Sequence, residues 1–218
     1  MGMRFTDREQ AGRLLAAALP QFRGLPDAVV LGLARGGVTV AAGAAAALQL
    51  PWDVLPVRKL GIPGHSETAF GALAAVNGRV VRVLNRPFVD EILELGIPQS
   101  ALDEVVRFEQ AELERRSGAY PGPRLPLAGK AVIVTDDGMA TGATMRAAVE
   151  AVRAAGAATV VVAVPVASLA AQGSLEHLAD AVFSLFIPGQ FRAVGSYYRT
   201  FRQVRDDDVV RLLGARGH

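Results

Sequence analysis

The chain has 218 residues, and 51% of them are hydrophobic, which is enough to build one domain around a sizeable core. Its formal net charge is only +2, and nearly all of its positive charge is arginine, because Lys59 and Lys130 are the only lysines. No run of basic residues interleaved with aromatic ones is present, so the composition argues against a nucleic-acid partner. The lack of cysteine excludes a disulfide framework and a thiolate metal site.

The hydropathy pattern argues against export and membrane insertion. The first residues, MGMRFTDREQ, lack the apolar core of a signal peptide. The alanine-rich windows are interrupted by Gly, Pro or charge well before the roughly 20 apolar residues that span a bilayer. We therefore expect a soluble, cytoplasmic protein with no membrane partner.

The first predicted elements are a helix, a strand and a second helix. Thr6 and Glu9 have the spacing of a capping box, which predicts a helix that ends at Pro20. Residues 28–33, AVVLGL, form a continuous apolar run typical of a buried strand. A glycine turn and an alanine-rich helix to Leu48 follow.

The next segment predicts a strand, a loop and a hairpin. Residues 53–58, DVLPVR, favour a second strand. Residues 59–69, KLGIPGHSETA, are polar and broken by Gly and Pro, which predicts a mobile loop. FGALAAV and VVRVL are β-prone, and the Asn77-Gly78 pair between them is the strongest short-range hairpin signal.

The second half of the chain alternates helices and strands. We expect helices at 88–95 and 100–116, a strand at 131–135, a helix at 144–155, a strand at 159–164, a helix at 168–178 and a strand at 181–185. Such alternation predicts the α/β class, with a parallel sheet flanked by helices.

Residues 132–144, VIVTDDGMATGAT, carry the strongest candidate site. Asp136 and Asp137 follow the strand at 131–135, and ligands of open parallel sheets bind beyond the carboxyl ends of strands. The stretch GMATGAT runs into a helix, whose free N–H groups can hold a phosphate that small side chains allow to approach. The carboxylates suit hydroxyls or a divalent cation next to that phosphate. A phosphorylated sugar fits both halves.

Two alternative interpretations of this stretch are a nucleoside-triphosphate loop and a purely structural turn. In a nucleoside-triphosphate loop of the GxxxxGK[ST] type a lysine would follow the last glycine, whereas Ala143 follows Gly142. In a purely structural turn, Asp136 and Asp137 would accept hydrogen bonds from nearby N–H groups and bind nothing.

Four apolar residues, two acidic residues, two variable positions and A-T-G-x-T resemble the phosphoribosyl-pyrophosphate motif of type I phosphoribosyltransferases. This resemblance implies that Asp136 and Asp137 contact the ribose 2- and 3-hydroxyls. It implies that the loop holding the 5-phosphate includes Gly138, Met139, Ala140, Thr141, Gly142, Ala143 and Thr144.

The same resemblance implies a pyrophosphate site. The turn between the first strand and its helix looks like the family's pyrophosphate loop, which often carries a cis peptide bond, and consists of Ala34, Arg35, Gly36 and Gly37. Arg58 and Lys59 end the second strand, where a family-like role is to bind pyrophosphate oxygens. Arg35 and Lys59 would stabilise the departing anion. The alternatives are an ordinary glycine turn and solvated cations.

The expected organisation is one domain, 1–218, with a type I phosphoribosyltransferase-like core and a small hood. The hood would consist of the loop and hairpin at 59–84 and a C-terminal segment, within about 59–120 and 186–218. Tyr197 and Phe201 would share one helix face and pack in a core. The chain also resembles a group of predicted phosphoribosyltransferases with no assigned acceptor, through LARGG at 33–37 and the segments 58–69 and 193–204.

The implied reaction moves a phosphoribosyl group from 5-phosphoribosyl 1-pyrophosphate to a nitrogenous acceptor and releases pyrophosphate. Mg²⁺ would be held mainly by pyrophosphate and ribose oxygens, with no dedicated protein metal site. Some purine-using relatives carry aspartate at the position of Ala140, so alanine there counts against a hypoxanthine or guanine acceptor. A non-catalytic sensor of phosphoribosyl pyrophosphate or a nucleotide is the alternative, and a homodimer is left open.

Overall fold

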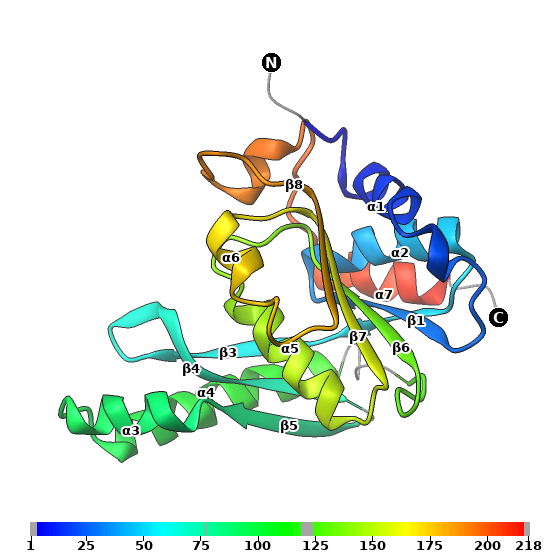
Figure 1. The fold of residues 1–218 in the computed structure, drawn as a ribbon. Helices are drawn as coiled ribbons and strands as arrows, with labels where there is room; N and C mark the ends of the chain where they lie inside the picture. The colour runs from blue at the N-terminus through cyan, green and yellow to red at the C-terminus, as the bar shows by residue number, and fades with distance from the viewer. Residues whose placement is uncertain (1–3, 77, 119–123, 216–218) are drawn as a thin grey trace.

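The computed structural model describes residues 4–76, 78–118 and 124–215, which form two sheets with helices around them (Figure 1). A parallel sheet has the order β2-β1-β6-β7-β8, and an antiparallel sheet has the order β3-β4-β5. The strands are β1 (Ala28–Leu33), β2 (Trp52–Leu55), β3 (Val57–Ile62), β4 (His65–Val76), β5 (Arg79–Leu84), β6 (Ala131–Thr135), β7 (Thr159–Val166) and β8 (Ala181–Phe186). The helices are α1 (Arg8–Ala17), α2 (Gly36–Leu48), α3 (Arg86–Glu94), α4 (Gln99–Ser117), α5 (Ala143–Ala154), α6 (Leu169–Gly173) and α7 (Asp206–Gly214).

The parallel sheet is buried on both faces, which explains why its strands are nearly continuous apolar runs. In β1, Val29 and Leu31 pack into the core shared with α5, whereas Val30 packs into the core shared with α1 and α2. This alternation follows from the two-residue period of a strand. The predicted parallel sheet with helices on both faces is confirmed.

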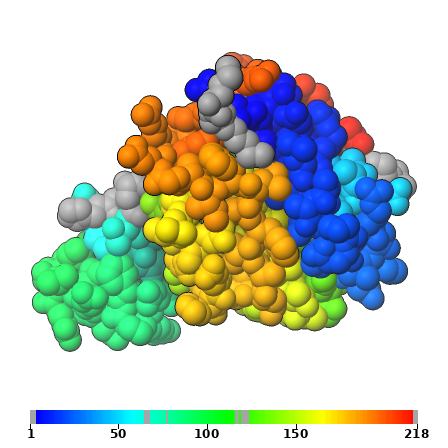
Figure 2. Space-filling model, turned by 45° about the horizontal axis from the view of Figure 1, so that its top comes forward, coloured from blue at the N-terminus to red at the C-terminus, as the bar shows by residue number. Residues whose placement is uncertain are grey.

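The antiparallel sheet forms a lobe together with α3 and α4, which we call the hood lobe (residues 57–117). One face of β4 places Ala72 and Ala74 in the core shared with α5, and the other face places Leu73 and Ala75 in a core with α3 and α4. Figure 2 shows α3 and α4, in green, protruding from one side of the molecule.

Two predictions for residues 53–69 are wrong. Residues 53–58 are not one strand, because the chain leaves the parallel sheet at Pro56: β2 pairs with β1, and β3 pairs with β4. Residues 59–69 are not a loop, since β3 and β4 pair along them with irregular register around Gly61. The buried side chains of Leu60 and Phe70 anchor this pairing, and local Gly and Pro content masked it in the sequence.

Other expected features shift by a few residues. The hairpin is confirmed by the pairing of Val76 with Arg79, while Asn77 lies outside the described residues. Asp7 caps α1 in place of Thr6, because its side chain accepts the N–H of Gln10 at 2.8 Å. The helix expected at 168–178 is limited to α6.

The C-terminal segment packs against the start of the chain. Tyr197 ends a short 3₁₀ helix and is buried, but Phe201 lies beyond that helix and is 38% exposed, so the two do not share a helix face. Phe5 forms a β-bridge with Tyr198, and their rings lie 5.4 Å apart. Within the part of the chain that the structure describes, no helix has the length and apolar character needed to cross a membrane.

Candidate active site

Two turns meet at the carboxyl edge of the parallel sheet. In the register of β1 and β6, Gly32 lies opposite Thr135, so the residues that follow the two strands begin side by side. The turn after β1 is the predicted pyrophosphate loop, 34–37, and the turn after β6 begins with the carboxylate pair, 136–137. The structure therefore brings together two candidate segments that lie far apart in the sequence.

The predicted pyrophosphate loop approaches the carboxylate pair so closely that side chains at its two glycine positions would clash. A Cβ on Gly36 would lie 2.1 Å from Oδ2 of Asp137. A Cβ on Gly37 would lie 2.6 Å from the backbone oxygen of Thr135. Both distances are below any real contact, so glycine at these two positions is a condition for the observed packing.

The carboxylate pair, Asp136 and Asp137, carries electrostatic strain. The N–H of Asp137 donates to Oδ1 of Asp136 at 2.8 Å. Burial raises the pKa of Asp136 well above its usual range, and the neighbouring charge of Asp137 raises it further. Burial also raises the pKa of Asp137, against the opposing effect of the Arg8 guanidinium. Groups perturbed in this way are typical of ligand sites.

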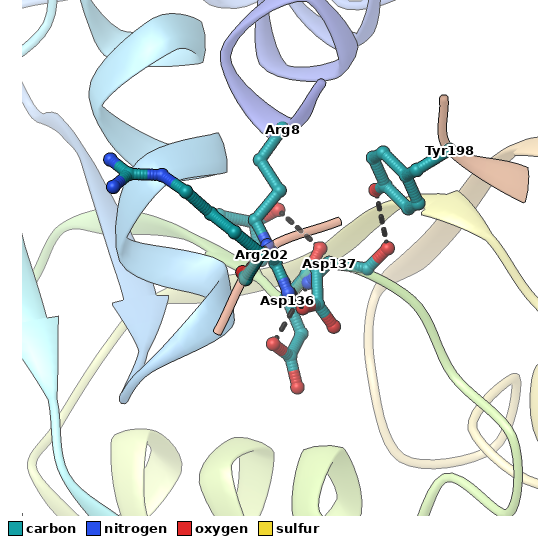
Figure 3. A network of polar contacts seen from close by, with 6 residues as sticks. Arg8, Asp136, Asp137, Tyr198 and Arg202 are labelled. Carbon is teal, nitrogen blue, oxygen red and sulfur yellow. Dashed lines mark hydrogen bonds and ion pairs between the residues drawn. The ribbon is translucent and has the colours of Figure 1, made fainter. Parts of the chain in front are cut away.

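Arg8 and Tyr198 reach the carboxylate pair from opposite ends of the chain (Figure 3). Arg8 is the first residue of α1, and its Nε and Nη2 lie 2.8 Å and 2.7 Å from Oδ2 of Asp137. Its Nη1 donates to the carbonyl of Arg202 at 2.9 Å. Tyr198 donates its hydroxyl to the carbonyl of Asp137 at 2.6 Å. The C-terminal segment thereby forms one side of the site.

Sequence reasoning missed both of these contacts. Arg8 follows a helix cap in the run TDREQ, where an arginine is normally solvated. Tyr198 stands in an aromatic segment and is buried, but the residue types around it give no information about the partner of its hydroxyl. Neither residue has a neighbour in sequence that points to the carboxylate pair.

The predicted phosphate loop, 138–144, leads into the N-terminus of α5. Gly142 is the N-cap with φ of +77°, a left-handed conformation that favours glycine. The amides at the start of a helix have no partner inside it and attract anions. Ala140 and Thr141 are exposed beside them, and Ala143 and Thr144 are half-buried.

Two residues of this loop lie against protein and not in open space. Met139 is 3% exposed, and its N–H donates to the carbonyl of Val166 at 2.8 Å. A Cβ on Gly138 would lie 2.7 Å from Val194 and 2.8 Å from Val166. Both residues therefore fix the loop through packing, and the side chain of Met139 does not face the site.

Arginine side chains line a cavity beside Asp137. A cavity of about 510 Å³ is lined by Arg8, Arg35, Gly36, Arg58, Asp137 and Phe201 among others. The peptide bond between Ala34 and Arg35 is cis. Nη1 of Arg35 lies 3.8 Å from Oδ1 of Asp206, and Nε of Arg58 donates to Oε2 of Glu109 at 2.6 Å.

Lys59 is not among the described residues that line the cavity beside Asp137. It lines a separate cavity between β3 and α4, together with Glu104 and Phe108. In the register of β3 and β4, Arg58 lies beside Leu73, on the face toward α3 and α4, and Lys59 lies beside Ala72, on the face toward α5. The expected contact of Lys59 with a ligand stays a prediction.

A larger cavity lies between α5 and the hood lobe. Its volume is about 780 Å³, and its lining includes Thr141 and Ala143 of the phosphate loop. Arg86 and Phe88, at the start of α3, line the opposite side. Among the described residues, no group of three or more His, Asp or Glu side chains is arranged to hold a metal ion.

The fold and the site define an open α/β protein with its ligand site at the carboxyl ends of parallel strands. Residues 8–199 match the family model described as the phosphoribosyl transferase domain, so the chain belongs to this family. It is 45% identical over 211 residues to "Putative phosphoribosyl transferase Rv0571c" of Mycobacterium tuberculosis, a match that covers 96% of this chain and 46% of that protein. The chain thus spans about half the length of the curated relatives it matches.

A solved structure supports the same fold. The crystal structure of TT1426 from Thermus thermophilus is 42% identical, with a TM-score of 0.81, and the match covers 97% of this chain and 98% of that one. A similarity of this extent includes both the parallel sheet and the hood lobe.

Proposed function

We propose that this protein transfers a phosphoribosyl group from 5-phosphoribosyl 1-pyrophosphate to a nitrogenous acceptor. The observation that carries the proposal is the close approach of Gly36 to Asp137, which sets the N-terminus of α2, a place that favours anions, directly beside a carboxylate pair. The phosphate loop leaves the same strand end as the pair. One ligand with a phosphate, vicinal hydroxyls and a second anionic group fits all three parts.

The carboxylate pair binds the ribose. Asp136 and Asp137 accept hydrogen bonds from the 2- and 3-hydroxyls, and their charge favours a ribose ring that becomes positive as the bond to pyrophosphate breaks. The 5-phosphate lies on the amides of residues 140–144 at the N-terminus of α5. The raised pKa values of the pair fit this use, because ligand hydroxyls and a cationic ring offset the cost of burying charge.

The departing pyrophosphate is stabilised by arginine. Arg35 and Arg58 line the cavity beside Asp137, so we assign the leaving-group contacts to them and to the amide of Gly36, while the amide of Gly37 hydrogen-bonds to the carboxylate of Asp136. Lys59, on the next position of β3, keeps the role in stabilising the leaving group that we expected for it. In the reaction, the C1–O bond to pyrophosphate breaks, the C1–N bond to the acceptor forms, and the acceptor nitrogen loses its proton.

Mg²⁺ fits this chemistry through the substrate. The oxygen ligands that this ion prefers are supplied by the pyrophosphate and the ribose hydroxyls, while the carboxylate pair binds those hydroxyls. When bound, the ion neutralises charge on the leaving group. The residues of the chain then orient the substrate and exclude water beneath the hood lobe.

Residue 140 restricts the acceptor. Ala140 is exposed, and its carbonyl accepts a hydrogen bond from Oγ of Ser168 at 2.7 Å, so the loop is tied to the N-cap of α6 at this point. Because alanine has no group that moves a proton, a purine acceptor that needs one at this position is disfavoured.

A screen of pyrophosphate release tests the proposal. The protein is incubated with phosphoribosyl pyrophosphate, Mg²⁺ and one of a panel of purines, pyrimidines and other nitrogenous compounds. We expect release with at least one acceptor and none with Asp136→Asn/Asp137→Asn. Substrate binding without release for any acceptor would contradict catalysis and favour a sensing protein.

A further inference from the structure

Arg8 is a buried cation beside the carboxylate pair, and the reaction as proposed above does not use it. It is 8% exposed, which is rare for arginine. Its Nε and Nη2 both contact Oδ2 of Asp137, and its Nη1 donates to the carbonyl of Arg202. The centre of its guanidinium lies 3.8 Å from the ring centroid of Phe201.

These contacts fix the guanidinium in one place. Three of its nitrogens are bound to protein oxygens, and the ring of Phe201 covers one face. A planar guanidinium held in this way is pre-organised, and a cation over an aromatic ring gains further stabilisation. Arg8 therefore does not swing between partners, and the carboxylate that it binds is oriented with it.

The carboxylate oxygens of Asp136 and Asp137 have different hydrogen-bond donors in the structure. Oδ2 of Asp137 accepts from Arg8, and Oδ1 of Asp136 accepts from the N–H of Asp137. Gly36 lies directly against Oδ2, because a Cβ there would meet that oxygen at 2.1 Å and Oδ1 at 3.3 Å. Oδ1 of Asp137 is thus the oxygen that Arg8 does not occupy.

We propose that Arg8 is the positioning residue of the carboxylate pair: it holds Oδ2 of Asp137 and leaves Oδ1 of Asp137 and the carboxylate of Asp136 to the ribose hydroxyls. This inference rests on the proposed function of the same site. It assigns a role to the start of α1 and to the Phe201 segment, which together hold the guanidinium.

The local charges support this role. The charged and titratable groups around Asp137 are Asp136 from the same turn, Arg8 from α1, Arg35 and Arg58 from the cavity wall, and Tyr198 from the C-terminal segment. Burial raises the pKa of both carboxyls, and Arg8 is the cation that opposes this rise in each. Without Arg8 the pair would bind protons at a higher pH and accept hydroxyls less well.

The test is the pH dependence of phosphoribosyl pyrophosphate binding, measured by calorimetry with Mg²⁺ between about pH 5 and 9. In Arg8→Gln we expect the acidic loss of affinity to move upward by about one pH unit. Arg8→Lys keeps the charge but not the planar fork, so we expect a pH profile near that of the wild type with several-fold weaker binding. Arg13→Gln is the control, because Arg13 is on the same helix, pairs with Glu9 and is exposed.

Three outcomes would overturn the inference. The first is an Arg8→Gln profile that weakens uniformly without moving along the pH axis, which indicates only a packing role. The second is wild-type affinity in Arg8→Lys. If Arg8→Gln does not fold, this second comparison still decides the matter.

The third outcome comes from an experiment without substrate. It separates an error in the role of Arg8 from an error in the proposed substrate. The carboxyl carbon resonances of Asp136 and Asp137 are followed by NMR in the free protein. Their titration must move to higher pH in Arg8→Gln and stay in place in Arg13→Gln. An unchanged titration contradicts the role of Arg8, whereas a shift combined with no binding by the wild type contradicts only the proposed substrate.

Discussion

Gly36 allows the segment 34–37 to pack against the carboxylate pair, because it lacks the Cβ atom that would meet Asp137. Its missing side chain leaves the space that Oδ2 of Asp137 occupies, and the neighbouring Gly37 does the same for the backbone at Thr135. Glycine here is a requirement of close approach, since neither residue has a positive φ.

Gly36→Ala is expected to displace the Asp137 carboxylate and reduce phosphoribosyl pyrophosphate affinity by roughly tenfold or more. The overpacking should also cost about 1–3 kcal/mol of stability. Calorimetric binding and denaturant unfolding measure the two effects. Gly173→Ala is the matched control, because a Cβ on Gly173 would meet nothing within 4 Å. Equal behaviour of the two variants would refute the packing argument.

We expect the free energy of unfolding to fall as the pH rises, because the buried carboxyl of Asp136 must then lose its proton. Its pKa is raised in the folded state, so the unfolded chain loses its proton first, and stability falls between the usual carboxyl pKa and the raised one. Asp136→Asn has no such loss and should be more stable at neutral pH by about 1 kcal/mol, although it binds substrate less well. The difference should vanish near about pH 3, below the usual carboxyl pKa.

Asp208 provides a control of opposite sign. Its pKa is lowered, first by the hydrogen bond with the N–H of Arg205, so its stabilising effect is present above the usual carboxyl pKa and is lost in acid. Asp208→Asn should therefore be less stable than the wild type at neutral pH. Unfolding curves at several pH values that show the same sign for both variants would contradict the assignment.

At the scale of elements, an ion pair between β3 and α4 holds Arg58, which we propose to contact the leaving group. Arg58 is bound by Glu109 of α4 through Nε at 2.6 Å and Nη2 at 2.5 Å, with both side chains partly buried. A pyrophosphate that binds Arg58 must compete with this carboxylate. The hood lobe thus holds one of the arginines of the cavity in place before the substrate arrives.

Glu109→Gln should release Arg58 and tighten binding of pyrophosphate with Mg²⁺ by about two- to tenfold, a change worth up to about 1.4 kcal/mol. Isothermal titration with pyrophosphate gives the affinity directly. Glu112→Gln is the control on the same helix, since Glu112 pairs with Arg115, three residues further along α4. Weaker binding in Glu109→Gln than in Glu112→Gln would show that Glu109 supports the site instead of competing in it.

The sequence predicts some elements better than others, for physical reasons. The strands β1, β6 and β7 are buried on both faces, so each is a continuous apolar run that is easily recognised in the sequence. The pairing of β3 with β4 across residues 59–69 is hidden, because half-buried β3 alternates weakly and Gly61 disrupts the register. Pro56 lies inside one apolar run of the sequence, although it separates two sheets.

The candidate site is predictable where local spacing determines it. Asp136, Asp137 and the phosphate loop follow from a strand end that runs into a helix, and the motif supplies their proposed roles. Arg8 is not predictable, because it reaches Asp137 across 129 positions of the chain through tertiary packing alone. Lys59 and Arg58 cannot be ranked without knowing which face of β3 meets the site.

At the scale of the whole molecule, the segment before α1 is joined to residues 197–199 beside the site. The N–H of Phe5 donates to the carbonyl of Tyr197 at 2.8 Å, and the N–H of Arg199 donates to the carbonyl of Phe5 at 2.8 Å. This junction holds α1, and with it Arg8, against the segment that carries Tyr198 and Phe201 (Figures 1 and 3).

Phe5→Ala removes a ring that is 1% exposed and packs against Tyr198. We expect a loss of about 3–5 kcal/mol of stability and weaker substrate binding in the protein that remains folded, because Arg8 loses its support. Thermal unfolding and calorimetry measure both. Leu14→Ala, at an exposed position of α1, should change neither by much. A stable Phe5→Ala protein with unchanged affinity would show that the contact of Phe5 with residues 197–199 does not support the substrate site.

The central claim, that the carboxylate pair and the phosphate loop form a phosphoribosyl pyrophosphate site, is tested most directly by calorimetric titration with that compound and Mg²⁺ at neutral pH. The account predicts saturable binding at or below millimolar concentration by the wild type and its loss in Asp136→Asn/Asp137→Asn, with the fold of the variant retained. No binding by the wild type, or equal binding by the variant, would contradict it.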